Sequence, residues 1–381
     1  MANTNATNTV FSGIAKVTEK ANLLGPNVIR LEVGDVDLAT SPLIKRGLIE
    51  AVEFDITHYP PLKGDRDLIK HICRELREKD RLMLDEEQIL ITPGGSMGIF
   101  LILLSMINPG DEIIVIEPIW PHFIQMISLV GGVAVIVPAS AGGFHIDSRK
   151  IEEAITPKTK AMLLNTPNNP TGTIYSTEEL QSVCLLAEKN DLIIISDEEY
   201  CNFIFGNNSF VSPATLYEKA FISRSFSKTY SASGLRLGFI VAPINDMDTL
   251  VKCSLFTTMY PASNIQHAVS YAMRLNDKYP ETLCNEYSSR MSFVVDKVNR
   301  VDGLSAYPSE GGVYVWIKFE KDSDDVKMCN FILDKALISM VPGSYFGESG
   351  RGYARLSLGQ CKERLAEAMD RLSVVMRVVK Q

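Results

Sequence analysis

The sequence is poor in cysteine and tryptophan, has no long apolar run, and shows no excess of positive charge. Its seven cysteines are dispersed over 381 residues, and no two of them form a C-x-x-C pair. Scattered cysteines in odd number do not suit a disulfide framework or a zinc site, so we expect a reduced, cytoplasmic setting and no metal. The most apolar run, residues 99–107, is much shorter than the roughly 20 residues that cross a bilayer.

Acidic residues outnumber basic ones by 46 to 38, which gives a formal net charge of −8. Nucleic-acid binding needs clustered positive charge, so we expect no nucleic acid as a partner. The first thirteen residues have neither the basic nor the apolar region of a signal peptide. These absences predict a soluble protein with no membrane partner. The length favours two domains, or one large domain with a satellite.

Short apolar runs alternate with helical patterns between about residues 88 and 243. Most runs are continuously apolar, as in strands that helices cover on both faces. This alternation predicts an α/β fold with a mostly parallel, seven-stranded sheet. Ser176 and Glu179 form a capping-box pattern at the start of a helix predicted over residues 176–189. The expected strands span residues 88–92, 112–117, 133–138, 160–165, 192–196, 220–225 and 235–242.

The pattern changes after about residue 264. Long amphipathic helices over residues 280–301 and 362–379 flank strands over residues 311–319 and 353–359, which indicates a smaller α+β domain. The first forty residues do not fit the repeat of the large domain, and we expect them to pack with the C-terminal part. The expected division is therefore a large domain of residues 43–270 and a small domain of residues 1–42 and 271–381.

Lys228 directly follows the expected strand over residues 220–225. Ser225 and Ser227 flank it, and Arg236 lies eight residues further on. A lone lysine is usually a solvated surface charge. At a strand end of an open parallel sheet, however, a lysine amine shielded from water can form a Schiff base with a carbonyl compound. Arg236 and the two serines would suit a phosphate group beside it.

Asp197 ends another buried strand. A buried acid is costly unless it is paired, so it is either a helix cap or satisfied core carboxylate, or the partner of a protonated ring nitrogen. In the second interpretation, Tyr200 would donate a hydrogen bond to a phenolic oxygen on the same ring.

A glycine-rich turn, residues 94–98, follows the first expected strand and opens a helix. Such glycines let backbone N–H groups approach an anion, although a simple tight turn would look the same. The residues also match G-x-S-x-G, and Ser96, Asp197 and His267 occur in the order of an α/β-hydrolase triad. We keep the hydrolase as a distant alternative, because no HGGG-like segment precedes the turn and a hydrolase leaves the lysine and arginine unexplained.

Three further residues have both a structural and a functional interpretation. Asn169 lies in a turn that is rich in Asn, Pro and Gly, and its amide could bind a ligand. Trp120 is a core aromatic or a flat surface for a planar cofactor. Arg355 is a surface charge or a bidentate partner of a carboxylate. Convergence of these residues on one sheet edge favours the functional interpretation.

With these residues the chain resembles the fold-type-I pyridoxal-phosphate enzymes, and among them the class I/II aminotransferases of the aspartate-aminotransferase type. The similarity rests on SFSK followed by GLRLG, together with NNPTG and DEEY, and runs from about residue 13 to the C-terminus. It implies a pyridoxal-5′-phosphate-dependent aminotransferase that moves an amino group between an L-amino acid and a 2-oxo acid. The large domain would bind the cofactor.

The resemblance also implies roles for the residues around the cofactor ring. Lys228 would carry the cofactor through a Schiff base and serve as the general base. Asp197 would hold the pyridinium N–H, and Tyr200 and Asn169 would bind the ring oxygen. Trp120 would stack on the ring.

Further roles concern the phosphate, the substrate and the partner subunit. Arg355 would bind the substrate α-carboxylate, helped by Asn169 and the backbone near Gly34. Tyr59 matches a tyrosine that reaches the phosphate in the neighbouring subunit, which implies a homodimer with shared active sites. The residues implied to hold the phosphate are Gly95, Ser96, Met97, Ser225 and Arg236.

Substrate and reaction type stay open. Dicarboxylate-specific relatives place an arginine in the segment that corresponds to residues 256–264, where this chain has Met259 and Tyr260 and no arginine. This favours an apolar, aromatic or uncommon amino acid. A C–S β-lyase or another amino-acid-transforming enzyme on the same fold is the main alternative, and a noncatalytic ligand-binding protein is a third.

Overall fold

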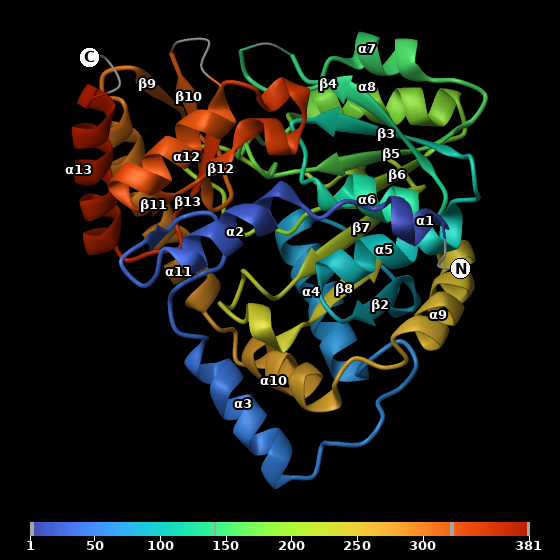
Figure 1. The fold of residues 1–381 in the computed structure, drawn as a ribbon. Coiled ribbons are helices and arrows are strands. Elements are labelled where there is room, and N and C mark those ends of the chain that lie inside the picture. The colour runs from blue at the N-terminus through green and yellow to red at the C-terminus, as the bar shows by residue number, and fades with distance from the viewer. Residues whose placement is uncertain (1–3, 141, 321–323, 379–381) are drawn as a thin grey trace.

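The computed structural model describes residues 4–140, 142–320 and 324–378. Its centre is a seven-stranded sheet with the strand order β2-β8-β7-β6-β5-β3-β4 (Figure 1). β8 is antiparallel to both of its neighbours, and all other neighbouring strands are parallel. The expected α/β class and mostly parallel seven-stranded sheet are confirmed. The strands are β2 (Ile89–Thr92), β3 (Glu112–Glu117), β4 (Val133–Pro138), β5 (Thr159–Asn165), β6 (Ile193–Asp197), β7 (Ala220–Ser225) and β8 (Gly238–Val241).

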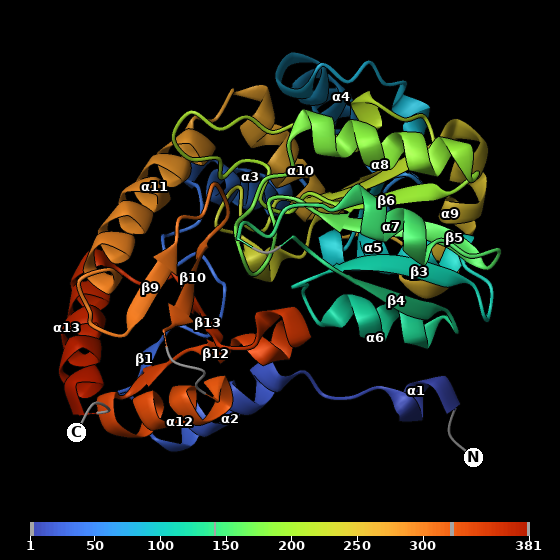
Figure 2. The same ribbon diagram turned by 90° about the horizontal axis from the view of Figure 1, so that it is seen from above.

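Helices cover both faces of this sheet (Figure 2). Successive strand residues point to opposite faces, so each face collects every second residue. In β3, Ile113 and Val115 pack in a core with α5 and α6, whereas Ile114 and Ile116 pack in a separate core with α7 and α8. The helices are α5 (Gly95–Met106), α6 (His122–Leu129) and α9 (Ile244–Thr257) on the first face, and α7 (Ser148–Ala154) and α8 (Thr177–Lys189) on the second.

Three helices enclose the β2 end of the sheet. Buried residues of α3, α4 and α10 form one core with Ile89 and Ile91 of β2 and Phe239 of β8. Ser41 caps α3, because its hydroxyl accepts hydrogen bonds from the N–H groups of Leu43 and Ile44. The three helices are α3 (Pro42–Glu53), α4 (Arg66–Asp80) and α10 (Ser263–Arg274).

The C-terminal part forms an antiparallel sheet with the order β12-β13-β10-β9, against which α11 and α13 pack. The N-terminal segment joins it, because β1 (Ile29–Arg30) pairs in parallel with β11 (Ile338–Ser339). The expected helix over residues 362–379 is α13, and residue 379 lies outside the described residues. The other elements of this part are α2 (Gly13–Leu23), α11 (Tyr279–Val298), β9 (Leu304–Tyr307), β10 (Tyr314–Phe319), α12 (Asp325–Ala336), β12 (Val341–Pro342), β13 (Tyr353–Ser357) and α13 (Lys362–Val378).

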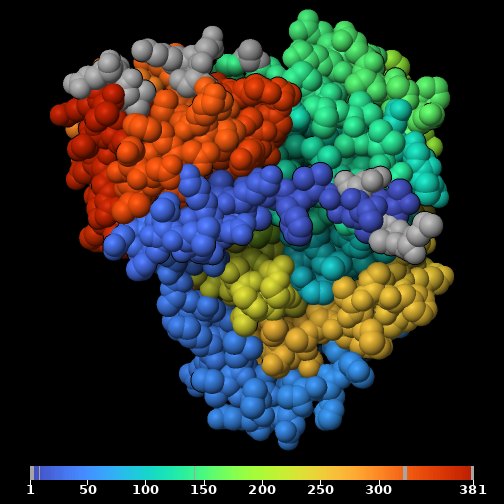
Figure 3. Space-filling model, in the orientation of Figure 1, coloured from blue at the N-terminus to red at the C-terminus, as the bar shows by residue number. Residues whose placement is uncertain are grey.

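The N-terminal segment runs across the surface from the C-terminal part toward α6 (Figure 3). The short helix α1 (Thr4–Asn8) lies near α6, and the Val10 N–H donates to Oε1 of Gln125 at 2.9 Å. All seven cysteines are free thiols. Among the described residues, no helix has the length and apolar character needed to cross a bilayer. Short 3₁₀ turns are η1 (Glu86–Gln88), η2 (Pro213–Thr215), η3 (Ser233–Leu235), η4 (Gly343–Phe346) and η5 (Glu348–Gly350).

Candidate active site

A cavity of about 220 Å³ lies at the carboxyl ends of β2, β5, β6 and β7. This is the edge at which open parallel sheets bind ligands, because the loops that follow the strands meet there. Tyr314, on β10 of the antiparallel sheet, also lines this cavity. Eleven of the residues singled out from the sequence line the cavity: Gly34, Gly95, Ser96, Trp120, Asn169, Asp197, Tyr200, Ser225, Ser227, Lys228 and Arg236.

Lys228 lies in the turn after β7, and its side chain is 15% exposed. Its ammonium nitrogen lies 3.8 Å from Oδ1 of Asp35, which also accepts a hydrogen bond from the hydroxyl of Ser233 at 2.7 Å. The lysine therefore sits largely shielded in the cavity, with the Asp35 carboxylate beside it. Sequence reasoning did not single out Asp35, although it directly follows Gly34.

The start of α5 forms an anion cradle with Arg236. Among the described residues, no side chain caps this helix, and Gly94 at its N-cap has a φ of 90°, which favours glycine. A Cβ added to Gly94 would lie 2.6 Å from Nη2 of Arg236, so only glycine lets the guanidinium pack on this turn. Uncapped N–H groups at a helix start beside a guanidinium are suited to an anionic group.

Arg236 reaches the cradle because the chain bends before β8. The expected strand over residues 235–242 begins only at Gly238. Ser233–Leu235 form a 3₁₀ turn and Arg236 takes a left-handed φ of 56°, which ends any continuous pairing upstream. The Arg236 side chain is then fixed by a hydrogen bond of 2.8 Å from Nη1 to the carbonyl of Ser233.

Asp197, at the end of β6, places its carboxyl group in the cavity. No cationic side chain of the described residues pairs with this carboxyl group. Its Oδ2 accepts a hydrogen bond from Nδ2 of Asn165 at 3.1 Å, and its Oδ1 accepts one from the N–H of Glu199 at 3.3 Å. Burial, and secondly the charge of Glu199, raise the pKa of Asp197 well above its usual value. A cationic ligand group at this position would reverse that effect.

Polar residues at the end of β7 and in the turn after β6 point to opposite sides of the sheet. Glu198 faces away from the cavity, where it binds Arg224 at 2.7 Å, and Arg224 in turn binds Asp80 at 2.7 Å. On the cavity side, the hydroxyl of Ser225 donates to Oε1 of Glu199 at 2.8 Å. Glu199 is thus a cavity residue that sequence reasoning missed, although its spacing of two from Asp197 could have revealed it.

Two tyrosines meet between the sheets. The hydroxyls of Tyr200 and Tyr314 lie 3.0 Å apart, and a Cβ on Gly34 would collide with the Tyr314 hydroxyl. Burial, and next the Tyr314 phenol, raise the pKa of Tyr200 well above its usual value. Tyr200 is therefore held in its neutral, proton-donating form. Tyr314 has no motif around it in the sequence, so only the fold identifies it as part of the site.

Arg355, on β13, does not itself line the cavity but lies directly behind Asn169 and Tyr314, which do. It is 2% exposed, and its Nη1 donates to Oδ1 of Asn169 at 2.8 Å while its Nη2 donates to the Glu32 carbonyl at 2.7 Å. The guanidinium also stacks over the Tyr314 ring at 4.1 Å. Its Nε is buried and has no hydrogen-bond partner among the described residues. An incoming carboxylate would supply a partner for this arginine.

Trp120 lines the cavity at the end of the loop after β3. Its ring stacks on His122, with ring centroids 4.2 Å apart, and meets Phe123 edge to face at 5.1 Å. Burial, and secondly the charge of Arg355, lower the pKa of His122. These contacts fix the indole plane at the cavity wall.

Three other residues named from the sequence lie elsewhere. Met97 packs against the core of α5 and does not line the cavity. Tyr59 is 78% exposed and contacts Tyr260, with ring centroids 5.1 Å apart. His267 pairs with Glu50 at 3.1 Å. The hydrolase triad is therefore not assembled, because His267 has this partner instead of Asp197.

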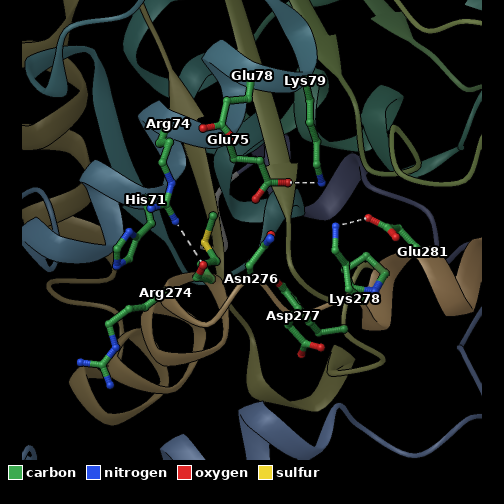
Figure 4. Close-up of a pocket in the computed structure, with 13 residues that line it drawn as sticks. His71, Arg74, Glu75, Glu78, Lys79, Arg274, Asn276, Asp277, Lys278 and Glu281 are labelled. Carbon is green, nitrogen blue, oxygen red and sulfur yellow. Dashed lines mark hydrogen bonds and ion pairs between the residues drawn. The ribbon is translucent and has the colours of Figure 1, made fainter.

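A second, larger cavity of about 270 Å³ lies between α4 and the segment that joins α10 to α11 (Figure 4). Two ion pairs join charged side chains of its lining, Lys79–Glu75 and Lys278–Glu281, both at 2.8 Å. It shares no lining residue with the first cavity. Nor do the described residues contain a group of His, Cys, Asp and Glu side chains that could hold a metal ion. The smaller cavity, which is lined by residues predicted from the sequence, is therefore the candidate active site.

Fold and site together define an α/β enzyme whose cavity is built around a lysine amine and an anion-binding helix start. Comparison with known proteins agrees. The sequence model of the family "aminotransferase class I and II" matches residues 26–372. A probable aspartate/prephenate aminotransferase of Aquifex aeolicus is 31% identical over 381 residues, which covers 95% of each chain. The aromatic-amino-acid aminotransferase 2 of Thermococcus litoralis is 30% identical over 358 residues and covers 92% of each chain.

A solved structure shows the same similarity. Aspartate aminotransferase of Thermus thermophilus, with maleate, superposes with a TM-score of 0.93 at 27% identity, covering 98% of this chain and 99% of that one. The chain belongs to the class I and II aminotransferases. The resemblance found in the sequence and the expectation of an aminotransferase are both confirmed.

Proposed function

We propose that the chain binds pyridoxal 5′-phosphate in the cavity around Lys228 and uses it to move amino groups between L-amino acids and 2-oxo acids. One observation carries the proposal: a shielded lysine amine, an acid without a cationic partner and an uncapped helix start with an arginine all face one cavity. Each of these groups suits a different part of the cofactor, namely the aldehyde, the ring nitrogen and the phosphate.

Different residues of the cavity would bind different parts of the cofactor. Asp197 would hold the protonated ring nitrogen, which agrees with its lack of a cationic partner in the part of the chain that the structure describes. Tyr200 and Asn169 would bind the ring oxygen, and Trp120 would stack on the ring. The phosphate would be held by Gly95, Ser96, Met97, Ser225 and Arg236. Met97 would contribute only its backbone, since its side chain packs in the core.

When bound, pyridoxal phosphate supplies an aldehyde carbon for amine attachment and an electron-accepting ring. The protein supplies positioning and proton transfer. Arg355 and Asn169 orient the substrate through its α-carboxylate, aided by the backbone near Gly34. The Lys228 amine, once free, takes the proton from the substrate Cα and returns it to the product as a general base and acid. Asp197 stabilises positive charge on the ring side throughout.

The substrate proposal is an L-amino acid with an apolar or aromatic side chain. Residues 256–264 contain no arginine, and Met259 is 50% exposed at the place where dicarboxylate-specific relatives carry one. Among the relatives above, one is named for aspartate and prephenate and another for aromatic amino acids. A panel of amino donors and 2-oxo acids with a spectral readout separates these classes.

We further propose a homodimer and the two-domain division. Tyr59 is exposed on the loop after α3, as expected of a residue that reaches a partner's phosphate site. Residues 43–270 would form the large cofactor-binding domain, and residues 1–42 and 271–381 the small domain. The pairing of β1 with β11 supports the joining of both chain ends in the small domain.

The decisive experiment is the substitution Lys228→Ala. In the wild-type enzyme, borohydride reduction should leave a stable cofactor adduct on Lys228. The variant lacks the amine that attaches the cofactor, so it should carry no such adduct. Turnover should fall by at least about 10³-fold, as for loss of a general base or nucleophile. A control is Lys189→Ala, on the exposed surface of α8. An adduct at another lysine, or full turnover by the variant, would contradict the proposal.

The same panel tests the lyase alternative. Formation of pyridoxamine phosphate with a 2-oxo acid product indicates amino transfer, whereas release of pyruvate and ammonia from a cysteine conjugate indicates a β-lyase. The absence of any spectral change or product with every donor would indicate a noncatalytic binding protein.

A further inference from the structure

Glu199 places a carboxylate inside the anion cradle. Its Oε1 accepts the hydroxyl hydrogen bond of Ser225 at 2.8 Å, and its Oε2 lies 3.0 Å from where a Cβ on Gly95 would stand. Lys228 and Arg236 both act on this carboxylate electrostatically. A carboxylate therefore already binds the serine hydroxyl and lies beside the helix start, where a phosphate group would bind.

We propose that Glu199 takes up a proton when a phosphate group enters the cradle, so that cofactor capture by this chain is coupled to proton uptake. This inference rests on the proposed function, because it concerns the phosphate of the same cofactor. Glu199 would then donate its new hydrogen to a phosphate oxygen, and no group other than solvent need supply the proton.

The physical reason is repulsion between like charges in a shielded site. A phosphate dianion and a carboxylate that share the same donors cannot both stay fully charged without a large energetic cost. The charged and titratable groups that face Glu199 are Lys228 and Arg236 from the segment after β7, and Asp197 and Tyr200 from its own segment. The start of α5 contributes only backbone N–H groups and the Ser96 hydroxyl to this side.

The sign of the pH dependence follows from linkage. Burial raises the pKa of Glu199 in the free protein, while Lys228, then Ser225 and Arg236, oppose this rise. The bound phosphate raises that pKa further. Affinity should be constant below the first pKa, then fall by up to about tenfold per pH unit until the second, since one proton is taken up on binding.

The test uses the full-length chain freed of cofactor and the probe 4′-deoxypyridoxine 5′-phosphate, which has no aldehyde and cannot react with Lys228. Calorimetry in two buffers of different ionisation enthalpy gives the number of protons taken up on binding. At about pH 8 the phosphate of the probe is a dianion, so its own titration contributes little. The wild-type chain should take up about one proton more than Glu199→Gln. The variant should bind the probe more tightly at high pH.

Three further variants serve as controls for the measurement of proton uptake. Glu199→Ala is a second uncharged variant in case Glu199→Gln does not fold, and Glu178→Gln on α8 makes the same charge change on the surface. Equal proton uptake by wild type and both Glu199 variants would overturn the inference. So would a loss of uptake in Asp197→Asn with normal uptake in Glu199→Gln. A wild-type chain that binds no probe would instead refute the proposed cofactor site itself.

Discussion

At the residue scale, the contacts of Arg355 support its proposed role in binding the substrate carboxylate. Its two hydrogen bonds, to Asn169 and to the Glu32 carbonyl, leave a planar guanidinium fixed over the Tyr314 ring. A planar fork of this kind matches a carboxylate with two parallel bonds, which a lysine ammonium cannot reproduce.

We therefore expect Arg355→Lys to lower kcat/KM by about 100-fold or more, which corresponds to ~3 kcal/mol lost at a buried charge pair. KM should rise for the amino acid and for the 2-oxo acid, because both carry the same α-carboxylate. Steady-state kinetics with both substrates measures this. An unchanged KM for both, in a variant with wild-type unfolding behaviour, would assign substrate binding to another residue.

At the scale of the element, strand alternation and helix caps place the site residues. In β7, alternation sends Ser225 toward the cavity and Arg224 to the opposite side. Asp197 ends β6 in the cavity, and in the turn that follows, Glu199 lines the cavity while Glu198 binds Arg224 on the opposite side. Helix α8 supports the face of β6 that lies away from α5. Its start is fixed by the capping box of Ser176 and Glu179, which the sequence predicts and the structure contains.

Ser176→Ala should destabilise the chain by ~1 kcal/mol, because the N–H of Glu179 loses its acceptor. The matched control is Ser182→Ala in the middle of the same helix, where alanine is the better helix former and stability should be equal or slightly higher. Urea unfolding of both variants gives the comparison. Equal loss of stability in the two would show that the cap contributes nothing.

On the scale of the whole molecule, an apolar surface surrounds the loop that carries Tyr59. Ile49 and Val52 on α3 are 61% and 60% exposed, and Phe54 just after the helix is 70% exposed. In Figure 1, α3 and the loop after it project from the body of the molecule. Several large apolar side chains exposed together are typical of an interaction surface, which agrees with the proposed homodimer.

Val52→Glu should therefore yield monomers in sedimentation velocity and lower the affinity for pyridoxal phosphate, because Tyr59 could no longer reach its partner's site. Val374→Glu on α13 is the control, since that valine is 65% exposed and lies in the C-terminal part. A stable dimer in the Val52 variant, or a wild-type monomer with full activity, would exclude this interface.

The sequence by itself determined the fold class, the order of the strands along the chain and most of the chemistry-bearing residues. Continuous apolar runs fix buried strands, and Lys228, Asp197, Asn169 and the turn after β2 occur in short motifs whose spacing is local. Such signals need no knowledge of distant contacts, because each strand and the turn after it are a few residues of one segment.

Only the tertiary structure decided which distant side chains complete the cavity. Tyr314, which lines the cavity, comes from an antiparallel sheet more than a hundred residues away from the Asn169 turn, and Asp35, which lies beside Lys228, comes from the N-terminal segment. Glu199 lay within a motif, yet its meaning depended on Ser225 and Arg236 being folded against it. Electrostatic effects depend on distance in space, and the chain order does not encode that distance.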